Sequence, residues 1–101
     1  MAKIHQSPIG LTVWHDAEEE KFPYTITGNP SRKFTVIDFE SAYDFEELVK
    51  SKVQHVGITF DSEYSQFFAY AKTENLAMQF VSNIENYFAK VRDMLNVNTE
   101  V

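Results

Sequence analysis

The feature that most constrains the fold is a long stripe of apolar residues near the C-terminus. Its members recur at intervals of three and four residues: Ala77, Phe80, Val81, Ile84, Tyr87, Phe88, Val91 and Leu95. This spacing places side chains on one face of an α-helix. Thr73 can cap the start of that helix, and Glu74 suits the positive end of its dipole. We therefore predict a helix over 74–95 and a C-terminal tail over 96–101.

Much of the remaining chain alternates between apolar and polar residues, which is the pattern of half-buried strands. Strands are predicted at 11–16, 22–27, 33–39, 55–61 and 66–72. Between the third and fourth strands the period becomes helical and predicts a helix over 42–53, where Ser41 and Asp44 form a start that resembles a capping box. Residues 1–9 are expected to form an N-terminal arm.

These elements predict a single domain over 1–101 with the order β-β-β-α-β-β-α. We expect the α+β class, with an antiparallel five-stranded sheet and two helices on one face. Consecutive strands usually pair, so two meander pieces are expected to join edge to edge. With 101 residues, 44% of them hydrophobic, the chain can bury a core without disulfides.

The segment QFFAYAK carries large apolar side chains on both faces of its predicted strand. If Phe60 pairs with Gln66, then Phe68 and Tyr70 face the core and Phe67 is exposed. If Phe60 pairs with Phe67 instead, Phe68 and Tyr70 stand on the open face. The first register is favoured, because it gives the more amphipathic sheet.

In either register some aromatic surface is left over. Trp14 lies on the face opposite Leu11 and Val13, and the strand at 33–39 is apolar on both faces. Two helices on one face leave the other face of such a sheet uncovered. We expect a second copy of the chain, in a homodimer, or a distinct protein to cover it. The alternative is that long Lys and Arg side chains, or the N-terminal arm, cover this face.

The charge balance narrows the class of partner. Nine basic residues stand against fifteen acidic ones, for a net charge of −6 and a pI near 4.9. This balance argues against a phosphate backbone or an anionic membrane surface, and it is compatible with a basic protein. The favoured interpretation of the charge itself is that it serves solubility. Binding of nucleic acid is disfavoured, because a base-stacking surface needs basic surroundings. The acidic residues recur in groups and could mimic the negative charges of a nucleic acid. The candidate binding residues are Trp14, Phe67, Phe68, Tyr70, Asp16, Glu18, Glu19, Glu20, Asp61 and Glu63.

Signals of catalysis are weak. The chain has no Cys, no Gly-rich phosphate loop and no nucleophile motif. His15, Asp16 and Glu18 could hold a metal ion, but a solvated acidic loop is the favoured interpretation. The acidic pairs lie at predicted turns, where water keeps the carboxylates ionised. We predict no catalytic residue, metal or cofactor, and no enzyme.

The N-terminal segment has no apolar run typical of a signal peptide, and no stretch approaches the length of a membrane span. A chain without Cys also fits a reducing compartment. A cytoplasmic location is therefore expected.

The order β-β-β-α-β-β-α, together with the acidic charge, resembles the body of the small acidic secretion chaperones without their leading helix. That resemblance implies a dimer that holds an extended client segment. The residues themselves favour a small acidic non-catalytic protein-interaction domain, such as an inhibitor or an anti-defence or antitoxin-like factor that binds a basic protein. The alternatives are a client binder like those chaperones, or a regulatory domain that binds a small ligand or nucleic acid.

Overall fold

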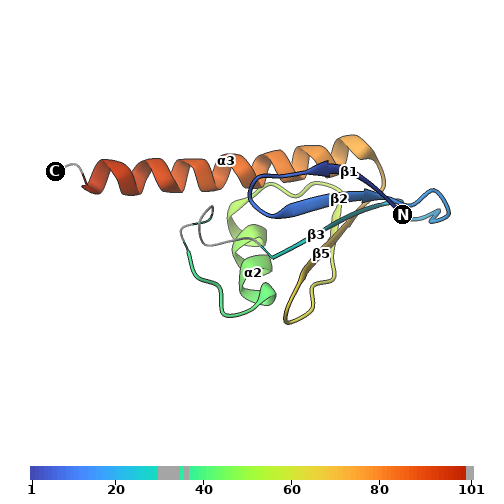
Figure 1. Ribbon diagram of the computed structural model, residues 1–101, viewed down its shortest axis with the longest axis horizontal. Helices are drawn as coiled ribbons and strands as arrows, with labels where there is room; N and C mark the ends of the chain where they lie inside the picture. The colour runs from blue at the N-terminus through green and yellow to red at the C-terminus, as the bar shows by residue number, and fades with distance from the viewer. Residues whose placement is uncertain (30–34, 36, 100–101) are drawn as a thin grey trace.

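The predicted α+β class is confirmed. The structure, a computed structural model, describes residues 1–29, 35 and 37–99. Within these residues, an antiparallel five-stranded sheet of order β1-β2-β3-β5-β4 packs with one face against two helices (Figure 1). The elements are β1 (Ala2–Gln6), β2 (Leu11–His15), β3 (Tyr24–Gly28), α2 (Ala42–Lys52), β4 (Ile58–Phe60), β5 (Phe67–Ala71) and α3 (Glu74–Thr99).

The sheet consists of two consecutive-strand pieces joined edge to edge, as predicted. Strands β1, β2 and β3 form a meander, and β4 and β5 form a hairpin. The join is the antiparallel pairing of β3 with β5, in which Ile26 lies opposite Ala69. This join brings the loop between β2 and β3 near the hairpin, although the two are distant in sequence.

The prediction of an arm over 1–9 is wrong, because Ala2–Gln6 is the edge strand β1. A tight turn at Ser7-Pro8-Ile9-Gly10 returns the chain to β2. The Gly10 N–H donates to the Ser7 carbonyl at 3.2 Å, and the Ser7 N–H donates to the Leu11 carbonyl at 2.7 Å. Gly10 has φ 98°, which glycine adopts without steric cost. This Pro and Gly spacing is the signal that could have found β1.

The predicted central strand at 33–39 is also wrong for its described residues, which belong to no strand; residues 33, 34 and 36 lie outside the described residues. The Thr35 hydroxyl donates to the Ile37 carbonyl at 3.0 Å. The Phe39 ring meets the Phe45 ring edge-on at 5.3 Å. Since β5 occupies the edge of β3, Ile37 and Phe39 bury their side chains against the core from a connecting segment rather than from a ladder.

Both predicted helices are present. Helix α2 begins after Ser41, whose Oγ accepts the Asp44 N–H at 3.4 Å. The Thr73 hydroxyl caps α3 by accepting the Leu76 N–H at 3.2 Å. Helix α3 runs to Thr99, so the helix is longer than predicted and residues 96–99 of the predicted tail are helical; residues 100 and 101 lie outside the described residues.

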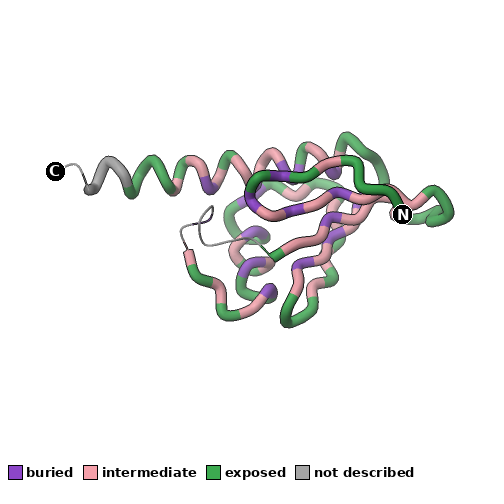
Figure 2. The backbone as a smooth tube through the Cα atoms, viewed as in Figure 1, coloured by how far each residue is buried: buried purple, intermediate pink, exposed green. Residues whose placement is uncertain are grey.

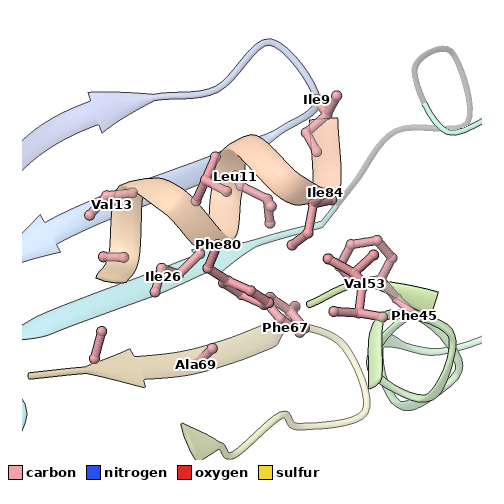
Figure 3. Close-up of a cluster of buried hydrophobic side chains, with 14 of the residues drawn as sticks. Ile9, Leu11, Val13, Ile26, Phe45, Val53, Phe67, Ala69, Phe80 and Ile84 are labelled. Carbon is pink, nitrogen blue, oxygen red and sulfur yellow. The ribbon is translucent and has the colours of Figure 1, made fainter. Parts of the chain in front are cut away.

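The core lies between the sheet and the helices, where the buried segments gather (Figure 2). In Figure 3 side chains from β2, β3 and β5 meet those of α2 and α3. Phe67 is fully buried, and its ring centroid lies 5.0 Å from that of Phe45 and 6.3 Å from that of Phe80. Apolar packing therefore ties both helices to β5.

The favoured hairpin register is wrong, and Phe60 pairs with Ala69 rather than with Gln66. A tight tip sets this register, since the Glu63 N–H donates to the Gln66 carbonyl at 2.9 Å. The faces are those of the second register: Phe67 and Ala69 lie under the helices, and the neighbouring side chains of β5 point to the open face. Burial of Phe67 among aromatic rings stabilises this register of the hairpin.

Helix α3 projects beyond the rest of the molecule at its C-terminal end (Figure 1). The long axis of the molecule is 53 Å, against 26 and 22 Å for the others. Met94 and Leu95, on the projecting part, are 66% and 46% exposed. Within the described ranges, neither helix is long and apolar enough to cross a membrane.

Candidate functional site

The open face of the sheet carries the aromatic side chains that do not enter the core. Val13, Ile26 and Ala69 are buried under the helices, so their strand neighbours point to the other side. One row across this face has Trp14, Thr25, Tyr70 and Thr59, in which each residue lies opposite the next. A second row sets Thr12 and Thr27 beside Phe68. The open face thus alternates between aromatic rings and threonine hydroxyls.

Trp14 lies across its neighbouring strand. Its indole N–H donates to the Thr27 hydroxyl at 2.9 Å, and the side chain is half-buried. The hydrogen bond satisfies the polar atom of the ring. The remaining indole surface is available for apolar contact with another molecule.

Near the ends of the strands, a hollow of about 330 Å³ opens on the same face. Its lining comes from the β2–β3 loop, from β3 and from the β4–β5 hairpin: Asp16, Glu19, Phe22, Thr25, Asp61 and Tyr70. The sheet brings these residues together, because β2 and β5 are the two neighbours of β3. The hollow therefore combines carboxylates with two aromatic rings.

Backbone hydrogen bonds position the carboxylates. The Asp16 N–H donates to the Pro23 carbonyl at 2.8 Å, which closes the loop after β2. The Asp16 side chain accepts the Glu18 N–H at 3.1 Å, as in an Asx turn. The Asp61 N–H donates to the Phe68 carbonyl at 3.0 Å, so Asp61 extends the β4–β5 ladder. Strand ends, rather than free loops, hold Asp16 and Asp61.

The surroundings of Tyr70 in the hollow shift the pKa of its hydroxyl. Burial raises the pKa of the Tyr70 hydroxyl above its ordinary value of 10.0. The negative charge of Asp61, the hydrogen bond that the hydroxyl donates to the Asp61 carboxylate, and the charge of Glu63 raise this pKa further. The Tyr70 hydroxyl therefore ionises less readily than that of a free tyrosine.

The two rings of the hollow form an open pair. The centroids of Phe22 and Tyr70 lie 6.3 Å apart with their planes tilted by 38°, so neither ring covers the face of the other. Lys21 Nζ lies 5.6 Å from the Phe22 centroid, within the range of a cation–π contact. A positive charge can therefore reach the aromatic surface of this site.

The structure brings together most of the candidate binding residues. Trp14, Phe68, Tyr70, Asp16, Glu19 and Asp61 share the open face. Glu18 and Glu20 are exposed in the loop outside the hollow, and Glu63 lies at the hairpin tip. The prediction of Phe67 as a binding residue is wrong, because its side chain is fully buried in the core and presents no surface to a partner.

Sequence reasoning missed Phe22 and Thr25. The sequence predicts Phe22 as the first residue of a strand, whereas β3 begins at Tyr24 and the Phe22 ring lies beside that of Tyr70. The Pro23 that follows it was the available signal, because proline favours the start of a strand. Thr25 carried no signal until its neighbours across the sheet were known.

The candidate metal ligands His15, Asp16 and Glu18 do not converge on one site. His15 stacks on Tyr24 at 4.8 Å, and alternation along β2 puts it on the face opposite Asp16. In the part of the chain that the structure describes, no group of three His, Asp or Glu side chains is placed to hold a metal ion.

Comparisons with protein-family models, with curated proteins and with solved structures each found no match. The candidate site therefore stands on its own geometry and chemistry.

Proposed function

We propose that this protein is a non-catalytic interaction module that binds a basic protein on the open face of its sheet, as an inhibitor or an antitoxin-like factor does. One observation carries the proposal: carboxylates and aromatic rings from separate segments converge on one hollow of about 330 Å³. Aromatic side chains supply contact area, and carboxylates supply steering and specificity toward positive charge.

The charges of the site support a basic partner. Asp16, Glu19 and Asp61 form no ion pair with any described residue; the pair between Lys50 and Glu46 belongs to α2. Three unpaired carboxylates on one face, in a chain of net charge −6, attract cationic surfaces and repel anionic ones. The same charges oppose the phosphates of a nucleic acid.

The charges also bear on the predicted homodimer. Two-fold symmetry through this hollow would bring Asp16, Glu19 and Asp61 of one copy against the same residues of the other. Like charges that meet in an interface destabilise it. The proposed partner of this face is therefore a different, basic protein rather than the second copy that the sequence led us to expect there.

The test compares capture of proteins from the native host by two charge-matched variants of the full chain. Asp16→Asn with Asp61→Asn removes two charges from the hollow and keeps the shape of the side chains. Glu47→Gln with Asp93→Asn removes two charges from exposed positions on α2 and α3. We expect the first variant to lose a basic partner that the wild type and the second variant retain.

A captured partner is then purified and its affinity measured by titration calorimetry at several salt concentrations. We expect the affinity to fall as salt rises, with a weaker dependence for the Asp16→Asn, Asp61→Asn variant, because charge attraction is screened. A partner that binds both variants equally, or one that is acidic and insensitive to salt, would contradict the proposed function.

A further inference from the structure

We infer that the hollow on the open face is a receptor for one guanidinium group, so that the basic partner is recognised through an arginine side chain. The hollow has a volume of about 330 Å³, which leaves room for a side chain of a partner to enter. This assignment rests on the proposed function, and the test below separates the two.

The polar groups of the hollow are complementary to a ligand that donates hydrogen bonds. Asp16, Glu19 and Asp61 are acceptors when ionised, and the Tyr70 hydroxyl lies close enough to Asp61 for this carboxylate to raise its pKa. A ligand that fits must therefore bring several N–H groups and a positive charge. An anionic ligand would meet three carboxylates, and only the Thr25 and Tyr70 hydroxyls could donate to it.

The aromatic walls favour a flat cation over a compact one. A guanidinium group is planar and weakly hydrated, and it stacks on a ring while its edge donates to carboxylates. Phe22 and Tyr70 stand 6.3 Å apart without covering each other, which leaves ring surface for such stacking. Asp16 and Glu19 come from one side of the hollow and Asp61 from another, so they can accept donors from different edges of the group.

Lysine satisfies these requirements less well. An ammonium group is strongly hydrated and binds carboxylates as a point charge without stacking. The chain's own Lys21 already places an ammonium group 5.6 Å from the Phe22 ring centroid, without an ion pair to a described carboxylate. An incoming lysine would duplicate this contact, whereas arginine adds the bidentate pairing that Lys21 does not supply.

The first experiment titrates the isotope-labelled full chain with N-acetyl-arginine amide and follows backbone amide shifts by NMR. N-acetyl-citrulline amide is the neutral analogue of similar shape, and N-acetyl-lysine amide matches the charge. We expect saturable shifts around Thr25, Asp61 and Tyr70 with arginine, at least fivefold weaker binding with lysine, and no saturation with citrulline. Bound arginine should also lower the raised pKa of Tyr70.

Three variants locate the binding. Asp16→Asn with Asp61→Asn should weaken arginine binding at least tenfold, while Glu47→Gln with Asp93→Asn leaves it within twofold of the wild type. Phe22→Leu keeps an apolar side chain but removes the ring, so it should reduce the preference for arginine over lysine. The amide spectrum of each variant shows whether the fold is intact.

Equal binding of the arginine and lysine amides would overturn the guanidinium assignment, and so would saturable shifts that lie outside the hollow. If a basic protein still depends on Asp16 and Asp61 in that case, the proposed function stands and only the assignment fails. If the arginine amide binds as expected but no basic protein depends on these residues, the proposed function fails.

Discussion

Truncation of Phe67 and of Phe68 should have very different costs, because the two rings lie on opposite faces of β5. Phe67 is fully buried, and its centroid lies 5.0, 6.1 and 6.3 Å from those of Phe45, Phe60 and Phe80. Phe→Ala substitution at such a site costs about 3–5 kcal/mol of unfolding free energy, since it removes burial and leaves a cavity.

Phe68 is half-buried on the open face, opposite Thr27. Complete burial of a Phe side chain contributes about 1.5–3 kcal/mol, so half-burial contributes about 1 kcal/mol. Phe68→Ala should therefore cost about 1 kcal/mol and leave no enclosed cavity. The expected difference between the variants is about 2–4 kcal/mol, a large part of the 5–15 kcal/mol typical of a whole domain.

Urea unfolding, followed by circular dichroism and by the fluorescence of the single tryptophan, measures both costs. With a slope of about 2 kcal/mol per M, Phe67→Ala should lower the midpoint by about 1.5–2.5 M and Phe68→Ala by about 0.5 M. A midpoint that falls as far for Phe68→Ala as for Phe67→Ala would refute the observed register of β5 and, with it, the position of the open face.

Three further outcomes follow from single contacts. Gly28→Ala should destabilise the fold by several kcal/mol in urea titration, because the added Cβ would overlap the Gly10 carbonyl oxygen; unchanged stability would contradict this close approach. Ser41→Ala should cost about 1 kcal/mol through the lost cap of α2, and a neutral result would refute the role of the cap. The raised pKa of Tyr70 means that above pH 10 the unfolded chain releases a proton that the folded chain retains, so unfolding free energy should fall as pH rises through that window. Tyr70→Phe should remove this part of the pH dependence, and an unchanged profile would contradict it.

The fold class could be predicted because period and capping are local properties. The helical stripe that begins at Ala77 and the alternation of Leu11 and Val13 each depend on a few neighbouring residues. The segment at 33–39 shows where this reasoning fails. Its β-branched and aromatic residues favour a strand, but β5 occupies the edge of β3 and the described residues 35 and 37–39 belong to no strand, so tertiary context overrides local preference there.

The candidate site could be predicted only as a set of residue types. The sequence shows acidic residues near Asp16 and Asp61 and aromatic residues near Tyr70. It does not show that these residues lie close together in space. Their convergence depends on the pairing of β3 with β5 and on the register of the hairpin, and a shift of one residue would turn Tyr70 into the core. The same dependence on register explains why Phe67 was wrongly predicted to be exposed.

The projecting end of α3 affects how the mass of the protein is measured. Gel filtration separates molecules by hydrodynamic size, and a protruding rod increases friction without adding much mass. The Cα radius of gyration is 14.0 Å, whereas a compact domain of this length has about 13 Å. A single chain should thus elute ahead of globular standards of equal mass and imitate a larger particle. Light scattering or sedimentation equilibrium, which weigh particles irrespective of shape, are the suitable ways to count subunits.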